Sequence, residues 1–169
     1  MLSPDENKFI QSIPKDKIVQ IFPFDPKVTQ AAEEIINQVH TFFPDLKIVH
    51  MGASGLKISG QNDIDLYILS PWREFDKYLH GLIKIFGTPK FKRRGSVAWD
   101  FNRNGFPVEL YLTDPTSEPM KRQIRVYETL KSNPEILKEY EELKHEMNGK
   151  SFREYQKQKY EFYHKILRI

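Results

Sequence analysis

Apolar side chains recur at helical spacing in two stretches of the first half of the chain. Between positions 28 and 43 they fall three or four residues apart, which is typical of one face of an amphipathic helix. The same spacing predicts a helix over 73–86. A shorter helix is expected over 2–12, because Ser3 suits an N-cap and Pro4 suits the first helical turn.

Short β-rich runs alternate with these helices. One of them covers 17–22 and is ended by Pro23. Asn104-Gly105 is a strong signal for a two-residue hairpin between two later runs. The other β-rich runs, which we expect to be strands, are 46–51, 64–69, 90–93, 96–102 and 106–112.

From Glu118 onward the pattern is helical and highly charged. Breaks at Asn133-Pro134 and Asn148-Gly149 divide this part into three helices. The order of elements predicts an α/β (α+β) fold, with a mixed β-sheet of about five or six strands flanked by helices and a helical C-terminal third. We expect a single domain over 1–169, with a core of about 17–114 and C-terminal helices over about 118–169.

Composition and charge narrow the classes of function. The chain has no cysteine, which excludes a disulfide scaffold, a thiolate metal site and a cysteine nucleophile. The net charge of +3 suits a protein that handles phosphates, although a lysine-rich surface kept for solubility explains it equally well. The N-terminus lacks the pattern of a signal peptide, and no apolar run is long enough to span a membrane. We therefore expect a cytoplasmic protein with no membrane partner.

Three acidic residues fall at positions that favour a metal site. Asp63 and Asp65 open the strand expected over 64–69, and residues two apart on a strand point to the same face. Two adjacent carboxylates repel unless a cation is present, and oxygen ligands suit Mg²⁺ or Mn²⁺. Glu109 is costly inside its apolar strand unless it lies beside this pair. Together the three could hold two cations and assist an attack on phosphorus, with Glu109 as the candidate base.

A turn of small residues lies 11 positions before this acidic pair. Gly52 lets the backbone approach a phosphate closely, and Ser54 adds a hydroxyl donor. Lys57 could reach a triphosphate, although a solvated lysine is the default interpretation of it. His50, just before the turn, is more often a hydrogen-bonded structural histidine than a catalytic one.

Other basic residues have both a functional and a structural interpretation. The run from Lys90 to Arg94 could bind a triphosphate or a polyanionic acceptor, yet an edge strand guarded by charge is the commoner explanation. Among the residues of the C-terminal helices, Lys159 is the one that we expect to line the cleft of the candidate site. Periodicity alone does not decide the location of the other tail candidates, which are Arg122, Arg125 and Tyr155.

The combined motifs resemble the nucleotidyltransferase (polymerase-beta-like) superfamily. That pattern is a Gly-Ser pair, then two acids split by one apolar residue, then a third acid between apolar residues. More narrowly, roughly residues 17–169 resemble the GrpB family of that superfamily. The stretches that carry the resemblance are Met51-Gly52-Ala53-Ser54, Asp63-Ile64-Asp65 and Val108-Glu109-Leu110, with 48–56, 127–135, 139–144, Tyr155 and Lys159.

The resemblance implies a single nucleotidyltransferase-like domain that moves a nucleoside monophosphate from an NTP to an unidentified acceptor. Its cofactor would be Mg²⁺ (or Mn²⁺), and its partners would be the NTP and that acceptor. Members of the GrpB family often lack the complete acid set, whereas this chain has all three acids, which favours an enzyme. The implied residues are Asp63, Asp65 and Glu109 for catalysis and metal binding, and Gly52, Ser54, Lys57 and Lys159 for nucleotide binding.

Two other hypotheses stay open from the sequence. One is a non-catalytic nucleotide- or metabolite-binding module on the same fold. The other is an adaptor that binds RNA or protein through its basic helical tail, against which the modest net charge speaks. Nucleic acid is therefore possible as a partner but is not favoured.

Overall fold

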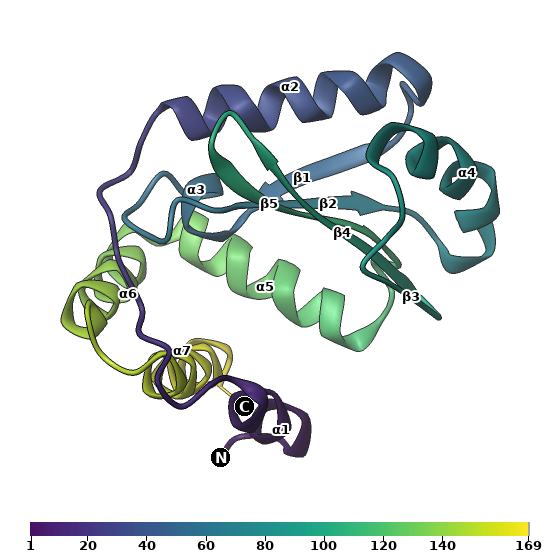
Figure 1. Ribbon diagram of the computed structural model, residues 1–169. Coiled ribbons are helices and arrows are strands. Elements are labelled where there is room, and N and C mark those ends of the chain that lie inside the picture. Colours follow the sequence, from purple (N-terminus) through teal and green to yellow (C-terminus); the bar gives the residue numbers. More distant parts are fainter. Residues whose placement is uncertain (169) are drawn as a thin grey trace.

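Five strands form one mixed sheet in the computed structural model, which describes residues 1–168 (Figure 1). Across the sheet the strands lie in the order β1-β2-β5-β4-β3. The central pair, β2 and β5, is parallel, and the other neighbouring pairs are antiparallel. The strand bounds are β1 (Lys47–Met51), β2 (Ile64–Leu69), β3 (Phe91–Arg93), β4 (Ser96–Arg103) and β5 (Phe106–Thr113).

One face of the sheet is covered by α2 (Lys27–Phe42) and α4 (Phe75–Phe86), which follows the 3₁₀ turn η1 (Trp72–Glu74). Alternate residues of β2 and β5 point into this core, as period-two geometry requires. Ile64, Leu66 and Ile68 are fully buried there. The intervening residues of β2 therefore face the opposite side, which is where the acidic side chains lie.

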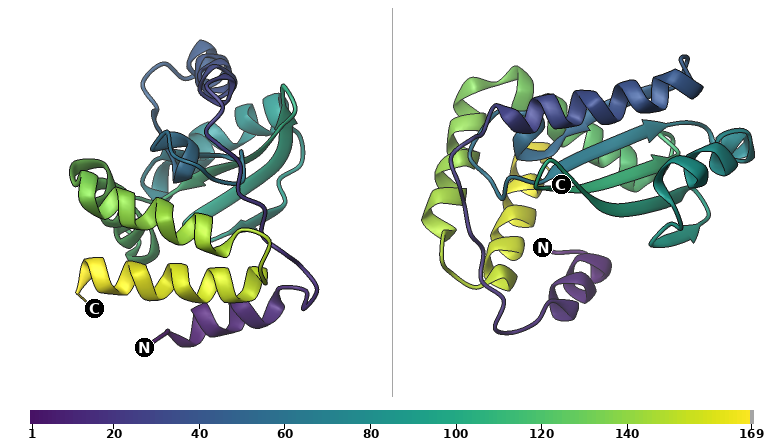
Figure 2. Two further views of the ribbon diagram at one scale, coloured as in Figure 1. Left: turned by 90° about the vertical axis from the view of Figure 1, so that its left-hand side faces the viewer. Right: turned by 45° about the horizontal axis from the view of Figure 1, so that its top comes forward.

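The opposite face is covered by α5 (Glu118–Ser132), and Met120 packs there against Met51 and Tyr67. Beyond α5 lie α6, α7 and the N-terminal helix α1, which Figure 2 shows stacked against one another. None of the helices within residues 1–168 is long and apolar enough to cross a membrane. The bounds of these outer helices are α1 (Pro4–Ser12), α6 (Pro134–Met147) and α7 (Phe152–Leu167).

The sequence signals for helix ends and the hairpin coincide with the structure. Ser3 caps α1, and its hydroxyl accepts a hydrogen bond from the Glu6 N–H. The Asn133 side chain caps α6, whose first residue is a proline. Asn104 and Gly105 both have positive φ between β4 and β5, as a tight two-residue hairpin requires. The predicted mixed α/β fold is therefore confirmed.

The β-rich run at 17–22 does not become a sixth strand of the sheet. Ile18 forms an isolated bridge with Ser151, and Phe22 forms another with Gly60. The Val19 N–H donates to the Lys150 carbonyl, in the turn between α6 and α7. The run is therefore an extended connector whose backbone groups pair with loops, so its β propensity is satisfied without a place in the sheet.

Candidate functional site

The parallel pairing of β2 with β5 brings the acidic residues together. Asp65 on β2 is in register with Glu109 on β5, and Asp63 lies just before β2 begins. On its other side Asp65 is in register with Met51, the last residue of β1. Asp65 and Glu109 therefore project from the same face of the sheet, toward the layer formed by α5 to α7.

The carboxyl group of Asp65 is strongly perturbed by its surroundings. Burial, together with the negative charges of Asp63 and Glu109, raises its pKa to about 8. The positive charges of Lys159 and Lys144 act in the opposite direction, which places both lysines within electrostatic reach. Asp65 therefore carries a proton through much of the neutral range unless a further positive charge comes close to it.

Glu109 has a partner that holds its side chain on the sheet. The Tyr111 hydroxyl donates a hydrogen bond of 2.7 Å to the Glu109 carboxylate. The Tyr111 ring stacks on Tyr67, with ring centroids 5.0 Å apart. Within residues 1–168 no three His, Asp or Glu side chains are arranged to hold a metal ion. Asp63 and Asp65 face the cavity described below. Glu109 lies beside Asp65 but does not line that cavity in this conformation.

Position 52 requires a glycine because its backbone lies directly against the Asp65 carboxylate. Its φ is +70°, a conformation that side chains rarely adopt. A Cβ atom at this position would collide with Oδ2 of Asp65. Gly52 begins the short helix α3 (Gly52–Gly55), directly after β1. The sequence therefore places a glycine where the backbone approaches the acidic cluster most closely.

Ser54 stabilises the loop through hydrogen bonds and does not line the cavity. Its hydroxyl donates a hydrogen bond of 2.6 Å to the carbonyl oxygen of Asp63. It must then accept from Nε2–H of His50, 2.8 Å away, because a hydroxyl has only one proton to donate. Burial lowers the pKa of His50 to about 4, so this ring is neutral at physiological pH. His50 and Ser54 together hold the backbone of Asp63 in place.

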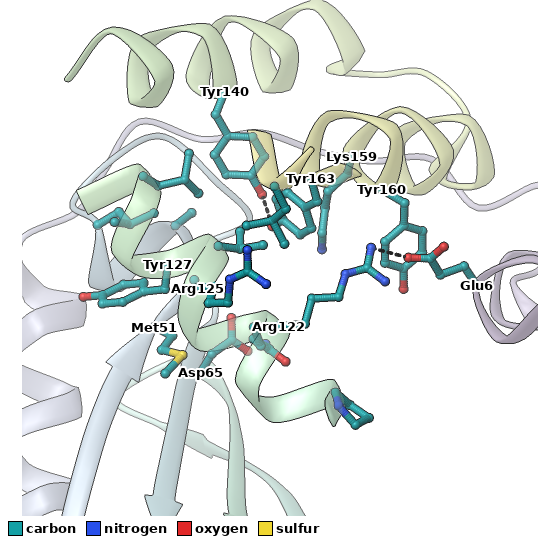
Figure 3. A pocket seen from close by; sticks show the side chains of 18 of the residues that line it. Glu6, Met51, Asp65, Arg122, Arg125, Tyr127, Tyr140, Lys159, Tyr160 and Tyr163 are labelled. Carbon is teal, nitrogen blue, oxygen red and sulfur yellow. Dashed lines mark hydrogen bonds and ion pairs between the residues drawn. The ribbon is translucent and has the colours of Figure 1, made fainter. Parts of the chain in front are cut away.

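A cavity of about 770 Å³ separates the acidic cluster from the helical layer (Figure 3). This volume is within the range of small-molecule sites. Gly52, Asp63 and Asp65 form part of its wall on the sheet side. Opposite them, α5, α6 and α7 contribute five tyrosines, which are Tyr127, Tyr140, Tyr155, Tyr160 and Tyr163.

Basic side chains of the helical layer line this cavity. Lys159 of α7 lines it, as do the three tail residues that the sequence left undecided, Arg122, Arg125 and Tyr155. Burial acts to lower the pKa of Lys159, but the tyrosines around it and Asp65 outweigh burial and raise that pKa overall. Lys159 therefore stays charged at the wall of the cavity.

Other cations singled out from the sequence lie elsewhere. Lys57 is exposed, has a φ of +58°, and does not line the cavity. Lys90 pairs with Asp100 of β4, and the remaining basic residues of 90–94 are exposed at the β3 edge of the sheet. These positions agree with solvated lysines and with a charged edge strand.

Several residues of the cavity wall were not singled out by sequence reasoning, and two of them are buried and charged. Lys144 is buried on α6, and Glu6 is buried on α1. Lys144 has a signal in the sequence, because it lies on the same helical stripe as Tyr140 and Met147, where an apolar residue is expected. The sequence marks Glu6 only as a helix-capping residue three positions after Ser3, because its side-chain partners, Arg122 and His164, are more than a hundred residues away along the chain.

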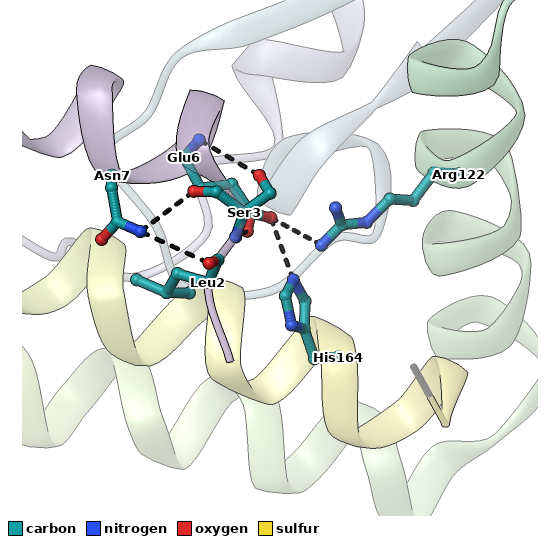
Figure 4. Close-up of polar contacts among 6 residues, drawn as sticks. All are labelled: Leu2, Ser3, Glu6, Asn7, Arg122 and His164. Carbon is teal, nitrogen blue, oxygen red and sulfur yellow. Dashed lines mark hydrogen bonds and ion pairs between the residues drawn. The ribbon is translucent and has the colours of Figure 1, made fainter.

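Glu6 closes one end of the cavity through a network shown in Figure 4. Its carboxylate accepts hydrogen bonds from Arg122 at 2.7 Å, from His164 at 3.0 Å and from the Ser3 N–H at 2.7 Å. Burial acts to raise the pKa of Glu6, yet these hydrogen bonds and the Arg122 charge lower it overall. The network attaches α1 to α5 and α7.

Comparisons with known proteins identify the family. The model of the GrpB protein family matches residues 18–168. The crystal structure of the conserved protein GrpB from Enterococcus faecalis has a TM-score of 0.65 at 14% identity, covering 88% of this chain and 97% of that one. A structure of the Cid1 poly(U) polymerase with MgGTP bound has a TM-score of 0.41 at 15% identity, covering 80% of this chain and 47% of that one. No curated protein matches the chain. Since the family model matches most of its length, this chain belongs to the GrpB family.

Proposed function

We propose that this protein is a metal-dependent nucleotidyltransferase, which moves a nucleoside monophosphate from an NTP to an acceptor that is not identified. The observation that carries the proposal is the environment of Asp65. Its carboxyl group lies beside Asp63 and Glu109, which with burial raise its pKa to about 8, and it faces a cavity that Lys159 enters from the other side. Carboxyl groups on the sheet wall, which a cation would keep ionised, and an ammonium group on the helical wall suit a metal–polyphosphate ligand.

The donor set fits Mg²⁺ or Mn²⁺ in its chemistry. Asp63 and Asp65 offer carboxylate oxygens in the cavity, and the repulsion that raises the pKa of Asp65 is relieved by a cation. In this proposal Glu109 completes the set. The cation, when bound, would neutralise charge on the phosphate oxygens and so make the attacked phosphorus more electrophilic.

The remaining roles belong to the residues of the chain. Gly52 lets the Asp65 carboxylate lie against the backbone of the turn, which lines the cavity where a phosphate would bind, and Lys159 binds the triphosphate from the helical side. The acceptor oxygen or nitrogen attacks the α-phosphorus, the bond to pyrophosphate breaks, and Glu109 accepts the acceptor's proton. Ser54 contributes through the backbone of Asp63, to which it is hydrogen-bonded, and Lys57 has no direct part.

Pyrophosphate release tests this proposal. The protein would be incubated with each NTP, Mg²⁺ or Mn²⁺ and a panel of hydroxyl, amine and phosphate acceptors. Wild type is expected to release pyrophosphate, and Asp65→Asn is expected to lose this activity while it stays folded. Asp76→Asn is the matched control, because Asp76 is exposed on α4 and remote from the cavity. Turnover retained in Asp65→Asn would refute the assignment.

A second candidate is a nucleotide- or metabolite-binding module that does not catalyse. The hydrogen bond from Tyr111 favours it, because it holds the Glu109 carboxylate away from the cavity where a base would act. Saturable NTP binding by wild type, with no pyrophosphate released across the acceptor panel, would support this function over the first.

A further inference from the structure

Lys144 is a buried cation without an acidic partner in the described part of the chain. Only 3% of the surface of Lys144 is exposed to solvent. Within residues 1–168 no carboxylate comes within 4.0 Å of its Nζ. Nζ donates one hydrogen bond, of 2.9 Å, to the Tyr155 hydroxyl. Lys144 lines the cavity that also contains Asp63 and Asp65.

A second lysine approaches the same tyrosine from α7. Lys159 lines the cavity one helical turn after Tyr155, and it too has no carboxylate within 4.0 Å among the residues described. Burial acts to raise the pKa of Tyr155, yet the charges of Lys144 and Lys159 lower it overall. The two ammonium groups therefore concentrate positive charge around one phenol, at the wall opposite the acidic cluster.

The neighbouring aromatic rings compensate this charge only in part. Lys144 Nζ lies 4.7 Å from the centre of the Tyr140 ring, and Lys159 Nζ lies 5.8 Å from that of Tyr163. Cation–π contacts leave most of the cost of burying an ammonium group uncompensated. An ammonium group also has three protons to donate, and Lys144 uses one of them on Tyr155. An anion in the cavity would satisfy the remainder.

We infer that Lys144, Tyr155 and Lys159 form an oxyanion site that binds a phosphoryl group. A phosphoryl group fits better than a carboxylate, because it presents three oxygens in different directions to donors from two different helices, whereas a carboxylate presents two in one plane. Arg125, which lines the same cavity from α5, adds a further cation at its exposed side. The source of the phosphoryl group, either the polyphosphate of an NTP or a phosphate of the acceptor, rests on the proposed function, but the site itself does not.

Binding of inorganic pyrophosphate to the full chain, measured by calorimetry in the presence of EDTA, tests the site without metal or nucleotide. Wild type is expected to bind it, and Lys144→Met and Lys159→Met are each expected to weaken it about tenfold or more, as the loss of a charge-assisted hydrogen bond does. Lys157→Met is the matched control, because Lys157 is exposed on α7 and does not line the cavity.

Two features keep this test decisive. Lys159 is less buried than Lys144, so Lys159→Met is expected to fold even if Lys144→Met does not. Asp65→Asn is expected to retain pyrophosphate binding, so a failure of the nucleotidyltransferase proposal and a failure of the oxyanion site give different results. Circular dichroism of each variant establishes that it is folded.

The outcomes either identify which phosphoryl group the site binds or refute the inference. Pyrophosphate that competes with MgATP supports a site for the nucleotide's polyphosphate, and pyrophosphate that binds together with MgATP supports a site for a phosphate of the acceptor. Pyrophosphate affinity unchanged in folded Lys159→Met would overturn the inference. So would the absence of any binding by folded wild type.

Discussion

Replacing Asp65 by asparagine is expected to stabilise the metal-free protein, increasingly so as the pH rises. Burial and the neighbouring acids raise the pKa of Asp65 to about 8, far above the 3.8 of an unperturbed aspartate. Between these two values the folded state binds a proton that the unfolded state has released. The free energy of unfolding therefore falls with rising pH, and asparagine, a neutral group of the same shape, removes this loss.

The magnitude follows from the size of this shift. Each pH unit between the two pKa values changes the free energy of unfolding by about 1.4 kcal/mol. Asp65 alone can therefore change this free energy by at most about 4 kcal/mol between pH 5 and pH 8. Asp65 is partly exposed, so solvent screening reduces the effect. We expect the advantage of Asp65→Asn over wild type to grow by about 2 kcal/mol across this interval.

Urea unfolding of wild type and Asp65→Asn at pH 5 and pH 8, in EDTA, measures this difference. Asp76→Asn is again the control, since its exposed carboxylate should give the same difference from wild type at both pH values. An advantage of Asp65→Asn that does not change with pH, or a loss of stability at pH 8, would refute the electrostatic account of the cluster.

Three other substitutions test separate parts of the structure. Gly52→Ala should lower the free energy of unfolding by at least about 1–2 kcal/mol in urea, because its φ is positive and its Cβ meets Asp65; an unchanged value would contradict the close approach. Glu6→Gln should cost about 1–3 kcal/mol at pH 7 by the same assay, because Arg122 loses a charged hydrogen-bond partner. That cost should vanish as the pH falls through the lowered pKa of Glu6, and an equal cost at pH 3 would exclude the ion-pair explanation. Lys57→Met should leave calorimetric NTP affinity unchanged, and a tenfold loss would return Lys57 to the site.

The sheet side of the candidate site was accessible to sequence reasoning. Asp63 and Asp65 border a strand whose apolar residues fill the core, and Glu109 interrupts another apolar strand, so both patterns require the acids on one face. The structure places these strands next to each other in parallel, with Asp65 and Glu109 in register. Period-two geometry predicts the face on which each acid lies because it needs only local residues, whereas the pairing of the two strands is a long-range contact.

The helical side could be predicted only in part. Amphipathic spacing in α5, α6 and α7 indicates which face of each helix is buried, but not which element it faces. Lys144 within the buried stripe of α6 was a usable signal, since a lysine there needs a partner. The contacts of Glu6 with Arg122 and His164 depend on how distant segments pack, and no local pattern reports that.

The hydroxyl of Ser54 illustrates a second limit of motifs. The Gly-Ser pair predicted a phosphate ligand, yet the serine proton is donated to the Asp63 carbonyl, and the oxygen accepts from His50. A sequence motif gives the position of a donor along the chain. Whether that donor is free depends on backbone geometry that only the folded loop defines.

The central claim is that Asp63 and Asp65 bind a metal–nucleotide complex in the cavity between the sheet and the helical layer. Calorimetric titration of ATP, GTP, CTP and UTP with Mg²⁺ or Mn²⁺, into wild type and into Asp63→Asn/Asp65→Asn, tests it most directly. We predict NTP binding by wild type that depends on the metal and is lost in the folded double variant. Metal-dependent binding that persists in the double variant, or no binding by folded wild type, would contradict the claim.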